Sequence, residues 1–265
     1  MVEGDFMKKL ISHFGMIFII TISLWFAGCD NGTTSNEQGT TLVCLGNSLT
    51  AGYGAATPGK DDKSKSYPAY LQKKVNIPVI NAGVSGDTSA QGLARVESEV
   101  LANDPRIVII ELGANDVFQG IPITTTKENL QSIIDKVDNG NRKIYIAKFY
   151  TEAVARAVLA GNGISNDAMQ TAVIKQYDDM YNTLVASNNV VLIENIWDGV
   201  WGIHMSDGFH PNAKGYEIMA DNYFKALEPY LKENNLMNKR VTGPRGIKSP
   251  TRMNLRGASA KRFKL

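Results

Sequence analysis

The chain has 265 residues, enough for one domain with a full hydrophobic core, and 43% of them are hydrophobic. Its formal net charge of +2 hides an uneven distribution, because residues 238–265 hold nine Lys or Arg and no acidic residue. Residues 29–237 hold 17 basic and 24 acidic residues, a net charge of −7 (17 − 24), which argues against nucleic acid as a substrate because a phosphate backbone attracts basic surfaces.

The N-terminal segment has the pattern of a secretory signal that ends in a cysteine. Two lysines, Lys8-Lys9, precede a mainly apolar run over residues 14–27, and Ala27-Gly28-Cys29 follows at its end. Small residues before a cysteine are similar to the bacterial lipobox, although Phe26 stands where Leu is usual. An uncleaved membrane anchor is the alternative, but the apolar run is short for a membrane-spanning helix.

We therefore expect a signal peptide over 1–29, lipidation of Cys29, and a location in the bacterial cell envelope, on the periplasmic side or at the cell surface. The expected partner there is the membrane, reached through the lipid anchor. Residues 30–40 are rich in Gly, Ser, Thr and Asn and are predicted to form a flexible tether.

Strand and helix patterns alternate beyond the tether. The expected strands are nearly continuous apolar runs, as is typical of strands buried on both faces: 41–46, 77–80, 106–112, 143–148 and 190–194. The expected helices cover 67–75, 88–102, 127–138, 167–187 and 213–233. This alternation predicts one α/β domain over 41–236, a three-layer α/β/α arrangement with a five-stranded parallel sheet.

Two further segments have open interpretations. The connection over 151–167 includes an expected short helix, Glu152 to Ala160, and is either a substrate-binding lid or an extra surface helix. The tail over 237–265 is predicted to be disordered, and its basic charge either favours an anionic lipid surface or has no role. Cys44 lies in the first expected strand and is predicted to be a buried small hydrophobe rather than a reactive thiol.

A serine, a histidine and an aspartate stand where they can act together. Ser48 follows the first expected strand directly, and a strand-to-helix turn there would expose its hydroxyl. Asp207 and His210 are three residues apart, one helical turn, so the carboxylate can reach the imidazole. A nucleophilic serine needs such a base, and the base needs a partner that fixes its tautomer. On that segment alone, the alternative is an aspartate that caps a helix and a histidine on a loop.

Two more blocks place hydrogen-bond donors at the carboxyl ends of expected strands, the edge where open α/β sheets bind ligands. Gly86 follows the second expected strand and can offer an unobstructed N–H. Asn115 follows the third and can offer a side-chain NH₂. Acyl transfer needs donors of this kind, aimed at a developing oxyanion.

Taken in order, four blocks resemble those of the SGNH (GDSL-type) hydrolases: Gly46-Asn47-Ser48-Leu49, Ser85-Gly86-Asp87-Thr88, Gly113-Ala114-Asn115-Asp116 and Asp207-Gly208-Phe209-His210-Pro211-Asn212. Residues 81–96 are especially similar to the bacterial thioesterase I, arylesterase and lysophospholipase branch. The resemblance covers about residues 40–234 and implies a flavodoxin-like SGNH hydrolase fold.

The resemblance implies that Ser48 is the nucleophile, His210 the base and Asp207 its orienting partner. It implies an oxyanion hole made by the Ser48 and Gly86 N–H groups and the Asn115 amide. The implied activity is that of a serine esterase that hydrolyses small carboxylic esters, thioesters or lysophospholipids through an acyl-enzyme on Ser48. We expect a monomer that uses no cofactor and no metal, since three His and no Cys pair give no zinc-type spacing.

Several alternatives stay open. His204 is the rival base, and Asp116 is expected to be a helix cap or loop anchor. Asn47 stands where the family usually has Asp; it is nearly isosteric but carries no charge. Alternative functions are a carbohydrate O-acetyl esterase and a catalytically silent envelope lipoprotein that binds lipid or glycan. Three aromatic residues either shape an acyl pocket or simply pack: Trp197, Trp201 and Phe209.

Overall fold

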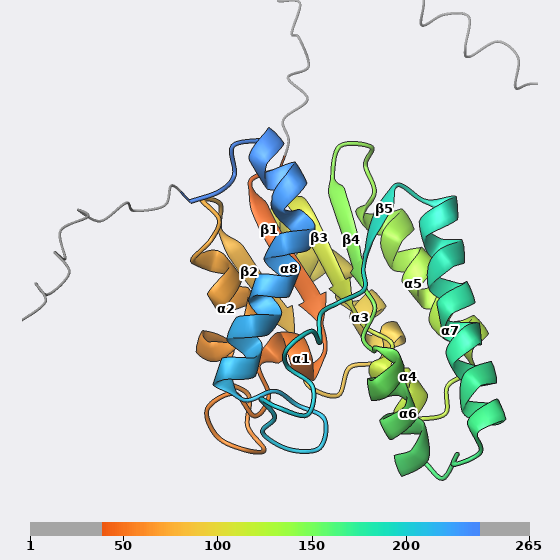
Figure 1. Cartoon of the computed structure of the whole chain (residues 1–265). Coiled ribbons are helices and arrows are strands. Elements are labelled where there is room, and N and C mark those ends of the chain that lie inside the picture. Colours follow the sequence, from red (N-terminus) through yellow and green to blue (C-terminus); the bar gives the residue numbers. More distant parts are fainter. Residues whose placement is uncertain (1–38, 239–265) are drawn as a thin grey trace, which may run out of the picture. The chain divides into compact units, whose positions relative to one another are not determined.

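A computed structural model of the chain describes residues 39–238 (Figure 1). The expected signal peptide with Cys29, most of the tether and nearly all of the basic tail lie outside these residues. Within the described part of the chain, no helix is long and apolar enough to cross a membrane.

Five strands form a single parallel sheet in the order β2-β1-β3-β4-β5. They are β1 (Thr41–Gly46), β2 (Val79–Gly83), β3 (Pro105–Glu111), β4 (Lys143–Ala147) and β5 (Val190–Ile193). Every residue of β1 and all but one of β3 are buried, because helices cover both faces of the sheet at its centre. The predicted five-stranded parallel sheet is therefore confirmed.

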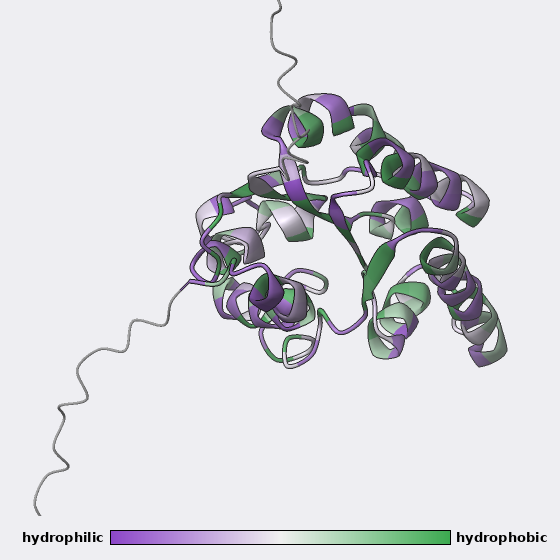
Figure 2. Cartoon of the chain, turned by 90° about the horizontal axis from the view of Figure 1, so that it is seen from above, coloured by the Kyte–Doolittle hydropathy of each residue, from purple (hydrophilic) through white to green (hydrophobic). Residues whose placement is uncertain are grey.

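The main helices are α2 (Tyr67–Gln72), α3 (Ser89–Ala94), α5 (Ile123–Val137), α6 (Glu152–Gly161), α7 (Asp167–Ser187) and α8 (Ala213–Glu233). α2 packs against α8 on one face of the sheet, while α3, α5 and α7 contact one another in succession on the other (Figures 1 and 2). This arrangement is the three-layer α/β/α fold expected from the sequence. Two single-turn helices, α1 (Ser48–Ala51) and α4 (Ala114–Phe118), follow β1 and β3 and are too short for sequence periodicity to predict.

The predicted helix over 88–102 is interrupted at Arg95, where the chain leaves α3 with φ −110°. A π turn (Val96–Val100) and a 3₁₀ turn (Leu101–Asn103) follow. Thr88 caps α3, with a capping box that includes Gln91. At the interruption, the Arg95 guanidinium bonds with carbonyl groups at the sheet edge.

The short helix α1 lies directly on β2. A Cβ atom at Gly83 would come within 2.3 Å of the Ala51 backbone nitrogen, so only glycine permits this approach. The first turn after β1 is thereby pressed against the neighbouring strand.

Both ends of the described chain lie at the edge of the sheet where the strands begin. Thr40 N donates to Asp104 O, just before β3. Met237 forms a bridge with Val75, and Asn238 N donates to Lys74 O, both ahead of β2. Backbone pairing thus continues two residues past the expected domain boundary at 236. The carboxyl ends of the strands, with the candidate catalytic residues, are at the opposite edge.

Candidate active site

Ser48 is the first residue of α1, at the sharp turn where β1 ends. Asn47 caps this helix with φ −102° and ψ −142°, and its Oδ1 accepts the Leu49 N–H at 3.0 Å. Asn47 and Leu49 are buried, whereas Ser48 between them is partly exposed. The strand-to-helix turn predicted from the sequence is therefore present, and it presents the hydroxyl of Ser48.

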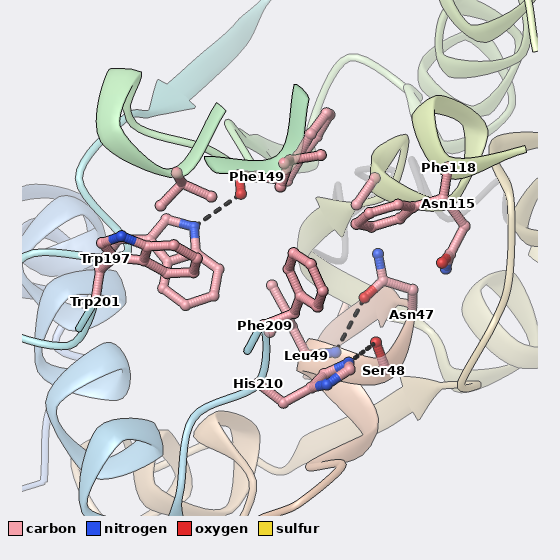
Figure 3. A pocket seen from close by; sticks show the side chains of 13 residues that line it. Asn47, Ser48, Leu49, Asn115, Phe118, Phe149, Trp197, Trp201, Phe209 and His210 are labelled. Atoms are coloured by element: carbon pink, nitrogen blue, oxygen red, sulfur yellow. Dashed lines mark hydrogen bonds between the residues drawn. The ribbon is translucent and has the colours of Figure 1, made fainter. Parts of the chain in front are cut away.

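The structure brings Ser48, His210 and Asp207 together. His210 Nε2 lies 3.0 Å from Ser48 Oγ (Figure 3), and Nδ1 of the same ring lies 2.9 Å from Asp207 Oδ2. The imidazole therefore links a hydroxyl to a carboxylate, which is the geometry a nucleophile, base and orienting acid require.

Asp207 and His210 meet across a narrow loop and not along a helical turn. Met205 and Pro211 form an antiparallel bridge, and Ser206 N donates to His210 O at 2.7 Å, which closes the loop. Asp207 Oδ1 accepts the backbone N–H groups of Phe209 and His210, both at 2.7 Å. The two side chains meet, as the three-residue spacing predicts. The helical turn expected between them is wrong, because the Asp207 carboxylate bonds to the backbone N–H groups of its own loop.

These contacts favour an ionised Asp207. Partial burial acts to raise the pKa of its carboxyl, but the Phe209 N–H and the His210 side chain outweigh burial and hold the pKa below its usual value. The His210 imidazole, which meets Asp207 through Nδ1, also packs against the Tyr53 ring, with 4.5 Å between ring centroids. Tyr216 Oη donates to Tyr53 O at 2.8 Å and fixes that neighbour. His210 is thus constrained from both sides.

Asn115 and Gly86, the expected oxyanion donors, are related through one contact. Asn115 is the second residue of α4 and lines the same pocket as Ser48. Its Nδ2 donates one hydrogen to Asp87 O at 2.9 Å, which ties α4 to the loop that holds Gly86 and leaves a second N–H on the amide. Gly86 has φ +90°, a conformation that favours glycine. Their oxyanion role stays a prediction.

Asp116 and His204 have other roles. The wholly buried Asp116 carboxylate accepts the Ser89 N–H at 2.8 Å and the Thr126 hydroxyl at 3.1 Å, so it joins the first residue of α3 to α5. His204 uses its backbone to bond Val200 O and the Asn212 N–H, and it is not among the residues that line the pocket.

A cavity of about 310 Å³ opens beside Ser48, near the lower end of the usual size for small-molecule pockets. Its polar residues are Asn47, Ser48, Asn115 and His210. The remaining lining is apolar (Figure 3) and consists of Leu49, Ala114, Phe118, Phe149, Val154, Val158, Trp197, Trp201 and Phe209. The three candidate aromatic residues do line the pocket, and α6 supplies Val154 and Val158. Phe118 and Phe149 were missed, because single aromatic residues after a strand give no periodic signal.

A buried carboxyl lies behind the nucleophile turn. Glu111, at the end of β3, is fully buried; its Oε1 accepts from Asn47 Nδ2 and its Oε2 from Thr50 Oγ1, both at 3.1 Å. Burial raises the pKa of Glu111 to about 8, although the Thr50 and Asn47 hydrogen bonds oppose the shift. An amide at position 47 can donate to this carboxyl, whereas an aspartate would add a second negative charge. The departure from the family pattern at Asn47 therefore has a physical partner that was not anticipated.

Arg95 ties the ends of the strands together, which sequence reasoning also missed. Its guanidinium donates to Gly46 O at 2.8 Å, Ala82 O at 2.6 Å and Asp87 Oδ2 at 2.7 Å. One side chain therefore links the residue before Asn47 to β2 and to the loop of Gly86. The only sequence signal for this role of Arg95 was a basic residue within the helix expected over 88–102.

Neither thiol nor metal chemistry is indicated among residues 39–238. Cys44 is buried, and burial raises the pKa of its thiol to about 12, so it is the inert small hydrophobe that was predicted. No cluster of three or more His, Cys, Asp or Glu in this region could hold a metal ion.

Most of the described chain is similar to known proteins. Residues 44–218 match the GDSL-like Lipase/Acylhydrolase family. The arylesterase of Vibrio mimicus is 31% identical over 82% of this chain and 100% of its own length. Esterase TesA of Pseudomonas aeruginosa is 28% identical over 75% of this chain and 92% of its own. Thioesterase 1/protease 1/lysophospholipase L1 of Escherichia coli K12 is 27% identical over 84% of this chain and 95% of its own length.

Solved structures show the same fold. The crystal structure of TesA aligns with a TM-score of 0.58 at 27% identity, covering 71% of this chain and 98% of that one. The psychrotrophic esterase EstA from Pseudoalteromonas aligns with a TM-score of 0.57 at 24% identity, covering 73% of this chain and 99% of that one.

The Glu111→Gln variant should lose less stability than the wild type as pH rises. Because the folded pKa of about 8 exceeds the ordinary 4.5, the folded chain keeps a proton that the unfolded chain releases. The resulting stabilisation is complete below the unfolded pKa and is lost as pH rises through about 8, at up to about 1.4 kcal/mol per pH unit. Urea unfolding at a series of pH values across this window measures the slope.

Glutamine keeps an acceptor for Asn47 Nδ2 and does not titrate, and its amide N–H can donate to Thr50 Oγ1 in place of the hydrogen bond that Glu111 Oε2 accepts from that hydroxyl. Glu128→Gln, on the exposed side of α5, is the matched control and should retain the wild-type slope. Parallel pH profiles for wild type and Glu111→Gln would contradict the assignment of a proton to Glu111.

Proposed function

The chain belongs to the GDSL-like lipase/acylhydrolase family and is a serine ester hydrolase, and we propose that it prefers carboxylic esters or thioesters with an acyl chain longer than acetyl. One observation carries the proposal: the hydroxyl of Ser48, bonded to His210, opens onto a largely apolar cavity. The arylesterase, acyl thioesterase and lysophospholipase types all fit this arrangement, because each transfers the acyl group of its substrate to a serine.

The proposed reaction starts with proton transfer from Ser48 Oγ to His210 Nε2 while Oγ attacks the acyl carbonyl carbon. Asp207 is ionised at neutral pH, because its pKa lies below the usual value. It accepts the hydrogen on His210 Nδ1 and stabilises the imidazolium that forms. The imidazolium then gives its proton to the departing alcohol or thiol, which leaves an acyl-enzyme on Ser48. Water repeats the sequence, so that ester and water yield acid and alcohol.

The negative charge that develops on the carbonyl oxygen needs donors near the end of β1. We assign this role to the backbone N–H groups of Ser48 and Gly86 and to the Asn115 amide. Arg95 and the Asn115 hydrogen bond to Asp87 O support the assignment, because they join the three backbone segments that carry these donors. Preorganised donors lower the barrier because they need no rearrangement as charge forms.

The cavity favours an acyl chain over a sugar-bound acetyl group. Transfer of each methylene from water to an apolar wall gains about 0.8 kcal/mol, whereas an acetyl group would leave most of this volume unused. An acetylxylan esterase from Geobacillus stearothermophilus is 24% identical over 94% of its length, so an O-acetyl esterase is the competing function. A lipoprotein that binds lipid or glycan without turnover is the competing proposal from another class.

We also propose a location in the cell envelope through a lipid on Cys29. The basic start, the short apolar run and the small residues before Cys29 support it. Diacylation or triacylation supplies the two or more chains that stable anchoring needs.

Ser48→Ala and His210→Ala should each lower kcat by at least about a thousandfold, and the double variant should be hardly worse, because the two side chains act as one unit. His204→Ala should keep most of the activity. Initial rates on a p-nitrophenyl ester measure the effect, and circular dichroism checks the fold. Reversed effects of the two histidine variants would overturn the assignment of the base.

The preferred acyl chain follows from rates on p-nitrophenyl acetate and p-nitrophenyl octanoate. We expect kcat/KM for the octanoate to be at least about tenfold higher, because its methylenes enter the apolar cavity. Activity on acetate alone favours the O-acetyl esterase, and activity on neither ester favours the binding lipoprotein.

Mass spectrometry of the membrane fraction should find a mature N-terminus at Cys29 that carries acyl chains. Cys29→Ser is the matched variant and should accumulate as an unprocessed precursor. An intact Met1 or Met7 terminus on the wild type would point instead to the uncleaved anchor, and a soluble chain that begins after Cys29 would exclude both.

A further inference from the structure

A second, smaller apolar cavity lies beneath α6, next to the pocket of Ser48. Its volume is about 30 Å³, close to that of a single water molecule. The cavity is partly open to solvent and is lined by α6, α7, Val117 of α4 and the chain after β4, with aliphatic side chains and aromatic rings as its walls. A space lined in this way offers water few hydrogen-bond partners and suits a hydrocarbon.

Two residues, Phe149 and Val158, line both cavities and therefore separate them. Phe149 is the fixed part of this partition. Its ring meets Tyr150, Tyr177 and Tyr181 edge-on, and its carbonyl accepts the Trp197 Nε1 hydrogen at 2.7 Å. Val158 is the movable part, because it belongs to the short helix α6 and is only partly buried.

Buried apolar side chains, Val154 and Leu159, and polar contacts near the surface hold α6 in place. Arg156 pairs at 2.6 Å with Asp167 of α7, whose side chain is 87% exposed, and its pair with Glu152 lies within α6 itself. Exposed ion pairs of this kind contribute little to stability, because solvent screens them and ordering long side chains costs entropy. Val158 is only partly buried, so its side chain can change rotamer and open the partition while Val154 and Leu159 stay packed.

We propose that the cavity beneath α6 is a second acyl subsite, which receives the terminal methylenes of a long acyl chain when Val158 moves aside. The proposal rests on the ester hydrolysis proposed above and adds a residue that sets the chain-length limit. Short chains end in the first cavity and do not reach the partition. Long chains pass Val158 and contact Ala155 and Val173, which line only the second cavity.

The test compares kcat/KM for p-nitrophenyl dodecanoate with kcat/KM for the butanoate. Val158→Ala removes part of the partition and should raise the dodecanoate-to-butanoate ratio by roughly three- to fivefold for each further methylene that becomes buried. Val173→Phe fills the second cavity from α7 and should lower the ratio below that of the wild type. Val173→Ile is a milder substitution that should move the ratio in the same direction if the phenylalanine variant does not fold.

Val185→Ala, on a part of α7 that lines neither cavity, is the matched control and should leave the ratio unchanged. A ratio that is the same in wild type, Val158→Ala and Val173→Ile would overturn the second subsite. Absence of butanoate and dodecanoate hydrolysis by the wild type would instead overturn the proposed function, so the two failures are distinguishable.

Discussion

The carboxyl of Glu111 holds the turn on which the nucleophile depends. Its two oxygens meet Asn47 and Thr50, the residues on either side of Ser48 and Leu49, so the single-turn helix α1 is fixed from beneath. A buried acid keeps such a position only when its polar atoms are satisfied and its charge is suppressed or compensated. Burial suppresses the charge by raising the Glu111 pKa, and the amide before the serine satisfies one carboxyl oxygen without adding a second charge. This chain therefore departs from the usual aspartate and still places the serine hydroxyl 3.0 Å from His210.

The remaining parts of the site are fixed to this turn by side chains that take no part in proton transfer. Arg95 joins β1, β2 and the Gly86 loop, while Asp116 joins the start of α3 to α5. Such supporting contacts reduce the reorganisation that a reaction would otherwise need. The acyl side of the pocket has a different construction, since α6 contributes apolar side chains there, of which Val154 is buried and Val158 is only partly buried. Hydrogen bonds and ion pairs therefore fix the reacting groups, while side-chain packing alone forms the wall that faces the acyl chain.

Much of the fold and of the proton relay could be predicted because their signals are local. Continuous Val- and Ile-rich runs predict buried parallel strands, and the spacing of Asp207 and His210 allows their side chains to meet. The path between those two residues was not predictable, because Asp207 bonds the backbone of its own loop and displaces the helical turn. The break at Arg95 and the partnership of Asn47 with Glu111 depend on contacts between distant segments. The role of Val158 depends on the helix packing of the finished fold.

The ends of the described chain and the nucleophile lie at opposite edges of the sheet. Residue 39 enters the domain at the edge where the strands begin, while the serine hydroxyl lies at the opposite edge. A lipid on Cys29 would be joined to that entry point by ten residues, which span at most about 35 Å when fully extended. Under the proposed anchoring, a domain whose entry edge faced the bilayer would open its pocket away from that bilayer. Such an enzyme would capture amphiphiles that have already left the membrane. Two properties would then limit its turnover: the aqueous solubility of the monomeric ester and the depth of the acyl pocket.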